Sequence, residues 1–295
     1  RNNIGMTRKE NLVGWAFVAL STVLIVVLVF IPMVQAIITS TQSGLGNNLK
    51  FVGFDNYLRL FGDKTFVKAA WNTVLYLLIQ VPIMIIFALI ISVMLNDRKL
   101  KLKGAFRTAI FLPCITSLVA YSIIMKSLFA PDGVVNQALL GMNMIAEPIQ
   151  WLTDPFWAKI LIIISITWRW TGYNMIFYLS GLQNIDPSIY EAADIDGCSA
   201  VRKFFKITLP LLKPIILFTT ITSTIGTLQL FDEVVNITQG GPANATITLS
   251  QYIYNLSFKY SPNFGYASAV SIVILVAIII LSAIQMKVGG DKREA

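Results

Sequence analysis

The chain has 295 residues, of which 56% are hydrophobic and 13% are charged, and its formal net charge is +8. A soluble domain usually has roughly 25% charged residues, so this composition indicates an integral membrane protein. With no histidine and two cysteines, the sequence excludes a histidine base and nearly excludes an imidazole or thiolate metal site. We expect no disulfide between Cys114, in an apolar run, and Cys198, in a polar loop.

Six apolar segments are long enough to cross a bilayer core of about 30 Å, which needs roughly 20 helical residues. They cover about residues 12–38, 73–95, 108–130, 157–182, 209–231 and 267–288. Prolines interrupt three of them, which helix packing in a membrane tolerates. The first is too long for the core of a signal peptide, so we interpret it as a permanent helix. The sequence therefore predicts an all-α membrane protein in which residues 1–295 form a single transmembrane domain with six helices.

The positive charges predict how this domain is oriented. Fifteen of the 23 Lys and Arg residues lie in the N-terminal tail, the loops after the second and fourth segments, and the C-terminal tail. The other three loops hold five. Because cytoplasmic loops carry an excess of Lys and Arg, both termini are predicted to be cytoplasmic. The net positive charge is then a consequence of topology, and no nucleic-acid partner is expected.

A polar loop between the fourth and fifth segments, about residues 186–210, carries a distinctive motif. Its sequence is Glu191-Ala192-Ala193-Asp194-Ile195-Asp196-Gly197, followed by Ile207, Leu209 and Pro210. We expect Asp186 and Pro187, with Ser188 as the N-cap, to begin a short helix. Paired alanines would keep one helix face flat for a partner, and Gly197 permits a sharp turn into a second helix. The alternative is an amphipathic connector with incidental alanines.

The fourth segment carries a lone charge, because Arg169 is the only charged residue between Ile160 and Ile185. A central arginine costs roughly 2.5–3.5 kcal/mol on insertion scales, so its side chain should face the bundle or a wet cavity. Trp170, Tyr173 and Asn174 share one helix face, and rings beside an amide suit a sugar. Two interpretations stay open. This face lines a substrate path, or it packs against helices with Arg169 bonded to a carbonyl or a partner-subunit acid.

The fifth segment repeats this kind of spacing. Ser223, Thr227 and Leu230 lie at i, i+4 and i+7, with Gly226 adjacent. Small hydroxyl residues in membrane helices also serve as contacts between helices, so packing is an equal alternative to substrate contact. The run Phe231-Asp232-Glu233 is expected toward the outer end of the segment, where a carboxylate can reach water or a docked protein.

The motif spacing is Glu-Ala-Ala, three residues, Gly, nine residues, Ile, one residue, Leu-Pro. It resembles the EAA loop of membrane subunits in bacterial binding-protein-dependent ABC importers. The run 167–214 and the cluster Thr238-Gln239-Gly240-Gly241-Pro242 resemble, within the carbohydrate-uptake class, the subunit equivalent to the larger maltose permease protein. The resemblance implies a type I importer permease fold in the bacterial cytoplasmic membrane.

The resemblance also implies roles for individual residues. Those that would shape the helix docking onto the ATPase are Glu191, Ala192, Ala193, Asp196, Gly197, Leu209 and Pro210. Those at the family's sugar-contacting positions are Trp170, Tyr173, Ser223, Gly226, Thr227 and Leu230. Trp170, Gly226 and Leu230 differ from the maltose pattern, so we expect the cargo to be handled differently from maltose.

The sequence contains no G-x-x-x-x-G-K-[ST] phosphate loop, so the chain is predicted to be a transport subunit and not an enzyme. No cofactor is expected on this chain, and ATP with Mg would belong to a separate ATPase subunit. The resemblance implies a second homologous permease subunit, two ATPase subunits and an external solute-binding protein that delivers a sugar. ATP would drive transport by favouring one of two bundle arrangements.

Two alternatives remain from the sequence. The same machinery could carry an acidic saccharide or a glycerol phosphate ester, with Arg169 as the counter-charge. A self-contained secondary transporter is the remoter alternative, because it would need coupling acids inside the spans, and only Asp232 and Glu233 near one edge qualify.

Overall fold

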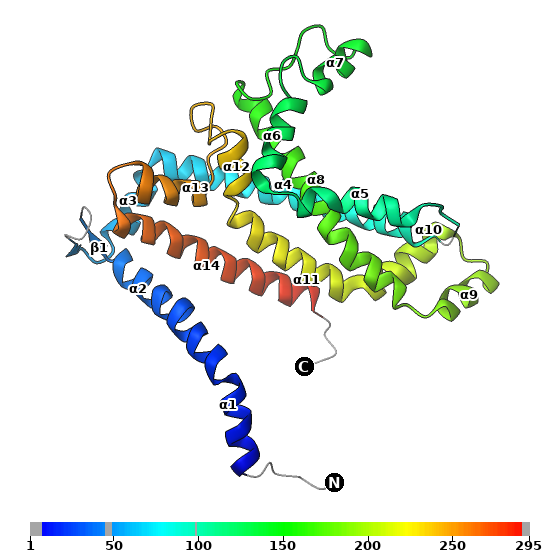
Figure 1. The fold of residues 1–295 in the computed structure, drawn as a ribbon, viewed down its shortest axis with the longest axis horizontal. Coiled ribbons are helices and arrows are strands. Elements are labelled where there is room, and N and C mark those ends of the chain that lie inside the picture. The colour runs from blue at the N-terminus through cyan, green and yellow to red at the C-terminus, as the bar shows by residue number, and fades with distance from the viewer. Residues whose placement is uncertain (1–7, 45–48, 98, 291–295) are drawn as a thin grey trace. The chain divides into compact units, whose positions relative to one another are not determined.

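The computed structural model describes residues 8–44, 49–97 and 99–290, and these are mostly helical (Figure 1). Contacts between Cα atoms divide them into two compact units. The first comprises residues up to Gly62 together with Asn255–Val273, and the second comprises Asp63–Tyr254 together with the residues from Ile274 onward.

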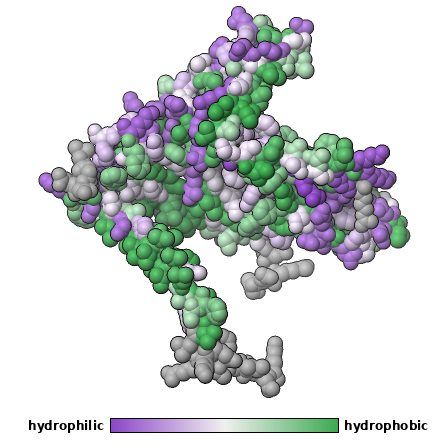
Figure 2. Space-filling view, viewed as in Figure 1, coloured by the Kyte–Doolittle hydropathy of each residue, from purple (hydrophilic) through white to green (hydrophobic). Residues whose placement is uncertain are grey.

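The first unit begins with a long helical run made of α1 (Arg8–Ile25), a π-helical turn η1 (Val26–Phe30) and α2 (Ile31–Ser40). The other elements of this unit are strands β1 (Gln42–Ser43) and β2 (Lys50–Phe51), α3 (Asp55–Gly62), η3 (Asn255–Lys259) and the start of α14 (Phe264–Gly289). The strands pair antiparallel, with Gln42 opposite Phe51. The Asn56 carboxamide donates to the carbonyls of Ser40 and Gln42, at 2.8 and 2.7 Å, and so fixes α3 to the end of α2. From Val13 to Ile38, exposed hydrophobic side chains cover the long helical run (Figure 2), so lipid or another membrane helix must cover it.

The second unit holds the remaining helices. They are α4 (Lys64–Asn96), α5 (Lys103–Ile115), α6 (Leu118–Leu128), α7 (Val134–Gly141), α8 (Pro155–Gln183), α9 (Pro187–Ile195), α10 (Ala200–Lys203), η2 (Phe204–Thr208), α11 (Leu209–Leu228), α12 (Asp232–Ile237), α13 (Leu249–Tyr254) and the rest of α14. Helices α4, α8 and α11 pack against one another. Side-chain caps begin the first two, because Asp63 accepts from Thr65 and Phe66, and Asp154 accepts from Phe156 and Trp157.

Two apolar clusters flank the contact between α4, α8 and α11. One gathers around Tyr76, Ile166 and Leu230 and joins α4 and α8 to α6 and α12, and the other gathers around Ala88, Tyr178 and Leu212 and joins α4, α8 and α11. Gln80 and Met84 lie between Tyr76 and Ala88 at steps of four residues, so they occupy the same stripe of α4 between the two clusters. Between the clusters, the Gln80 carboxamide, the Thr227 hydroxyl that bonds to it and the Asn174 carboxamide form a polar layer around Met84.

Within the described residues, five helices are long and apolar enough to cross a membrane. They are Val13–Ser40, Lys64–Asn96, Pro155–Gln183, Ala200–Leu228 and Phe264–Gly289. A sixth span exists only if α5 and α6 are counted together, and these bend by 104° relative to each other. The third helix expected over residues 108–130 is therefore two helices, α5 and α6, which make a sixth span if they are taken as one broken span. The helix breaks because Thr116 is extended and Ser117 begins a new helix by accepting from the backbone N–H of Ala120.

Other helix ends also differ from the expected ranges. Helix α4 begins at Lys64, well before residue 73, because Asp63 supplies a cap that hydropathy does not register. The helical run expected over 209–231 extends instead from Ala200 to Leu228, so Leu230 lies beyond its end.

Candidate functional site

A cavity of about 150 Å³ lies among α4, α8 and α11 in the second unit. Its walls are formed by Gln80, Met84, Ile166, Trp170, Tyr173, Thr222, Ser223, Gly226, Thr227 and Leu230. Each helix contributes residues spaced by three or four positions, as one face of a helix must. The cavity therefore draws together three segments that are far apart in the sequence.

The six residues that the resemblance assigned to sugar contact all line this cavity. They are Trp170, Tyr173, Ser223, Gly226, Thr227 and Leu230. Arg169 and Asn174, which the sequence also offered for the substrate path, are not among the lining residues. The Asn174 amide donates to the Trp170 carbonyl at 2.9 Å and to the Met84 sulfur at 3.3 Å, so it supports the wall from behind.

Aromatic rings and hydroxyl groups share the cavity wall. The rings of Trp170 and Tyr173 meet edge to face, with centroids 5.6 Å apart, and Tyr173 continues to Phe177 at 5.0 Å. Thr222, Ser223 and Thr227 line the same cavity from α11. Rings stack on the C–H faces of a sugar while hydroxyl groups exchange hydrogen bonds with its own hydroxyls. An added Cβ at Gly226 would meet nothing within 4 Å, so this glycine leaves the wall open.

Four lining residues were not identified from the sequence: Gln80, Met84, Ile166 and Thr222. A signal for Gln80 was present, because it is an amide in the middle of an apolar span, and polar groups in such positions usually face the interior. Met84 and Ile166 carry no comparable signal, since apolar residues fill every face of their helices.

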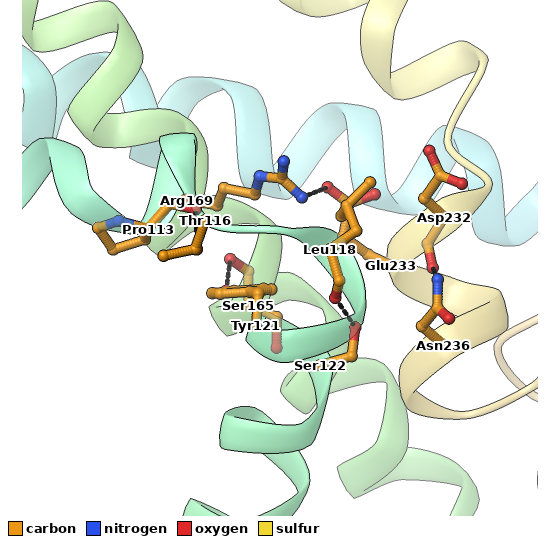
Figure 3. Close-up of polar contacts among 10 residues, drawn as sticks. All are labelled: Pro113, Thr116, Leu118, Tyr121, Ser122, Ser165, Arg169, Asp232, Glu233 and Asn236. Atoms are coloured by element: carbon orange, nitrogen blue, oxygen red, sulfur yellow. Dashed lines mark hydrogen bonds and ion pairs between the residues drawn. The ribbon is translucent and has the colours of Figure 1, made fainter.

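Arg169 pairs with Glu233, as Figure 3 shows. Their Nη1 and Oε1 atoms lie 3.6 Å apart, and the side chains are 11% and 6% exposed. The guanidinium also lies 5.7 Å from the ring centre of Tyr121, whose hydroxyl donates to the Ser165 carbonyl at 2.6 Å. Arg169 thus pairs with an acid of its own chain, a partner that neither interpretation named, since packing was expected to use a backbone carbonyl or a partner-subunit acid.

At the outer end of the fifth span, Asp232 is exposed and its carboxylate can reach water, as the sequence predicts, whereas the neighbouring Glu233 is buried, at 5% exposed. After α11 ends, the chain turns and α12 packs against α6 and α8, which returns Glu233 to the interior. A buried arginine needs a nearby negative charge to offset the cost of removing it from water. The pair therefore joins α12 to the middle of α8.

The EAA segment, defined as residues 186–210, contains α9, α10 and η2. Asp186 is the N-cap of α9, because its carboxylate accepts from the backbone N–H of Ser188 at 2.9 Å. The expectation that Ser188 would be the cap is therefore wrong. Pro187 takes the first helical position, where its missing N–H costs nothing, so the cap must precede it. The Ser188 backbone N–H holds the pKa of the Asp186 carboxyl below its ordinary value.

Gly197 ends α9 with the turn that the sequence predicts. Its φ is +67°, and the N–H groups of Gly197 and Cys198 donate to the carbonyls of Asp194 and Ala193, at 3.1 and 2.9 Å. This pair of bonds is the Schellman arrangement, which needs a left-handed residue and so favours glycine. Lys203 forms an ion pair with Asp194 and closes the turn on α10.

The remaining motif residues differ in exposure. Ala193 is buried, whereas Glu191, Ala192, Asp196 and Pro210 are exposed and Leu209 is half-buried. The two alanines therefore do not form one flat face, because neighbouring positions on a helix point in different directions. Exposed apolar side chains, including Ile195 at 87% and Val201 at 67%, accompany them. The surface of the EAA segment has the character of a protein interface.

Comparison with known proteins finds relatives that are all membrane components of transport systems. Residues 59–289 match the family model described as "Binding-protein-dependent transport system inner membrane component". The chain is 58% identical over 282 residues to the lactose transport system permease protein LacF of Rhizobium radiobacter, covering 95% of each. It is 34% identical over 263 residues to the arabinooligosaccharides transport system permease protein AraP of Bacillus subtilis (strain 168), covering 88% of this chain and 83% of that relative.

Solved structures confirm the fold. The chain superimposes with a TM-score of 0.82 on a chain of a bacterial alginate ABC transporter in complex with alginate pentasaccharide-bound periplasmic protein. The match covers 96% of this chain and 95% of that one, at 24% sequence identity. The predicted all-α, type I importer permease fold is confirmed. The chain belongs to the family of binding-protein-dependent transport system inner membrane components.

Proposed function

We propose that this chain is a permease subunit of an ATP-driven importer, and that it passes a neutral sugar through the cavity among α4, α8 and α11. One observation carries this proposal. Two aromatic rings and several hydroxyl and amide groups converge on the cavity, and none of its ten lining residues is charged. That combination suits a polar, uncharged molecule with apolar C–H faces.

The same observation disfavours an acidic cargo. Arg169 is the charge that an acidic saccharide or a glycerol phosphate ester would need, but its guanidinium lies beside Glu233 and outside the lining. Identity of 58% to a permease named for lactose transport supports a neutral oligosaccharide, and lactose is the first candidate to test.

The proposed assembly contains a second, homologous permease subunit, two ATPase subunits and an external solute-binding protein. ATP and Mg would bind to the ATPase subunits. The exposed surface of the EAA segment, from Glu191 to Pro210, would dock onto one ATPase. Because hydrogen bonds between nearby residues hold this segment in shape, it could pass a movement of the ATPase to the transmembrane helices. The proposed location is the bacterial cytoplasmic membrane, crossed several times with both termini inside.

The test is uptake into proteoliposomes that hold the complete transporter, with radiolabelled lactose and a galacturonate disaccharide as competing cargoes. We expect ATP-dependent uptake of the neutral sugar and little of the acidic one. Preferred uptake of the acidic sugar would support the alternative cargo. Uptake by this chain alone, without the ATPase, would support a secondary transporter.

The proposed orientation has its own test. Met142 is 69% exposed beyond α7, so a Met142→Cys variant lacking the native cysteines should react with an impermeant maleimide added to intact cells. The native Cys198, in the EAA segment, should be protected in a variant that lacks Cys114. Labelling of Cys198 from outside would reverse the orientation.

A further inference from the structure

We infer that Gln80 reads a pair of neighbouring hydroxyl groups on the transported sugar, and that this residue thereby sets which sugars pass. The inference rests on the proposed function, because it concerns the same cavity. Gln80 lies midway along α4, lines the cavity and is 2% exposed. A third helix then contributes to recognition, beside α8 and α11.

The amide nitrogen of Gln80 has a poor partner. Among the hydrogen bonds of the described residues, its Nε2 donates to the Met84 sulfur, at 3.3 Å. A thioether is a weak acceptor, and this sulfur also receives the Asn174 amide at 3.3 Å. A carboxamide nitrogen has two hydrogens to donate, so Gln80 keeps donor capacity that the protein does not satisfy well.

The amide oxygen of Gln80 also has an incompletely satisfied hydrogen bond. Its Oε1 lies 3.1 Å from the Thr227 hydroxyl, which lies 2.9 Å from the Ser223 carbonyl. A hydroxyl has a single hydrogen, so Thr227 can donate to the backbone carbonyl or to Gln80, but not fully to both. When it bonds to the carbonyl, the Gln80 oxygen is open to another donor.

The surroundings make these unmet bonds important. Apolar clusters lie on both sides of the polar layer, with Tyr76 in one and Ala88 in the other. Leaving a buried polar group without a good partner is costly, so a ligand that supplies one is favoured. Adjacent hydroxyls on a sugar ring offer a donor from one carbon and an acceptor from the next. A planar carboxamide can pair with both at once, while Trp170 and Tyr173 contact the faces of the ring.

This geometry predicts selectivity as well as affinity. A site that hydrogen-bonds a hydroxyl rejects an analogue that lacks it, because the protein group is then left unpaired. Removing either of the two hydroxyls from the sugar should therefore lower its uptake while Gln80 is present. The same removal should change uptake little in a variant that lacks the Gln80 amide.

The experiment measures initial uptake of lactose and of its monodeoxy analogues by the complete transporter in proteoliposomes, with saturated binding protein. For the wild type, we expect about tenfold slower uptake of the two analogues that lack a hydroxyl at one of two adjacent ring positions. In Gln80→Leu and Gln80→Met, lactose uptake should fall by a similar factor, and discrimination at those two positions should disappear. Discrimination at the other positions should persist. Two variants of different shape are used so that a folding defect in one does not decide the outcome.

Gln229→Leu is the matched control, because Gln229 is an exposed glutamine just beyond α11 and does not line the cavity. Its discrimination profile should equal that of the wild type. Each Gln80 variant is compared with the wild type using the same binding protein, so selectivity contributed by that protein cancels. Normal sugar uptake with an unchanged profile in both Gln80 variants would overturn this inference and leave the proposed function intact. Absence of sugar uptake by the wild type would overturn the proposed function and, with it, this inference.

Discussion

The cavity is assembled from three helices that are far apart in the sequence, whereas the EAA segment is a single stretch that bonds to itself. Around the cavity, side chains such as Gln80 and Thr227 reach across between helices α4 and α11. In the EAA segment, Asp186 caps α9, Gly197 terminates it and Lys203 returns to Asp194. Five of the ten residues that line the cavity are buried, and apolar clusters flank them, whereas the EAA segment is largely exposed.

This difference implies that substitutions act differently in the two regions. Apolar clusters on both sides hold the helices around the cavity in place. Changing one lining side chain should therefore alter the contacts that the cavity offers to a sugar, without moving the backbone. The EAA segment depends on backbone conformation at a few positions, so a change there should alter its shape. Each of the following predictions can break or sharpen that contrast.

The largest effect on stability is expected for Arg169→Ala, because the ion pair of Arg169 with Glu233 is buried beside the cavity. Removing one partner of a buried ion pair leaves the other charged and unpaired, which typically costs about 3–5 kcal/mol. We expect Arg169→Ala to lower the thermal stability and assembly of the purified transporter. Arg169→Leu combined with Glu233→Leu should recover most of the loss, since no lone charge remains. A normally assembled Arg169→Ala complex that fails to transport would instead assign Arg169 to the substrate or to gating.

Gly197→Val should disrupt the EAA segment next most strongly. A β-branched residue is strained at a φ of +67°, and such strain costs on the order of 1–3 kcal/mol. The variant should reach the membrane but lose sugar-stimulated ATP hydrolysis in the reconstituted complex. Gly141→Val is the control, because Gly141 has an ordinary φ and open space around its Cα. Normal stimulated hydrolysis in Gly197→Val would contradict the proposed docking role.

Two changes to the cavity wall should slow uptake without altering assembly. Tyr173→Ala removes a ring and Ser223→Ala removes a hydroxyl, and losing such a contact with the sugar costs about 1–3 kcal/mol. We expect uptake to fall by roughly five- to a hundred-fold in rate. Ser180→Ala, an exposed position on α8 outside the cavity, should transport normally. If both cavity variants matched that control, the substrate path would lie on other helix faces.

The smallest effect is expected at the start of α9. Asp186→Ala removes the cap, and we expect sugar-stimulated ATP hydrolysis to fall by about twofold, whereas Asp186→Asn retains an acceptor for Ser188. The backbone bond holds the pKa of Asp186 below its ordinary value, so the carboxylate favours the folded helix at neutral pH. That contribution is lost as the pH falls through the lowered pKa. Equal loss in both variants at neutral pH would show that the cap is unimportant.

The EAA segment could be predicted well from the sequence because its structure is local. The motif from Glu191 to Gly197 places a helix and a glycine turn within a few residues of each other, and neighbouring residues make the bonds that form them. Two details were wrong: Asp186 and not Ser188 is the cap before the proline-led first turn, and the paired alanines do not share one face.

The cavity could be predicted only in part. The spacing of residues on α8 and α11 identified which of their faces carries polar groups, but it could not show which face of α4 meets them. Gln80 and Met84 were missed for that reason. The bend between α5 and α6 and the return of Glu233 to Arg169 were also missed. Both depend on turns at Ser117 and after Leu228, which hydropathy averaged over a span does not reveal.

The most direct test of a sugar path through this cavity is to fill it. An added side chain at Gly226 meets open space, so Gly226→Leu should occupy the cavity without displacing its neighbours. We predict that lactose uptake by the reconstituted transporter falls by about tenfold or more, with the amount of assembled complex unchanged. Gly104→Leu, at a glycine on α5 that also has open space, should transport as the wild type does. Uptake by Gly226→Leu at the rate of the wild type would contradict the account.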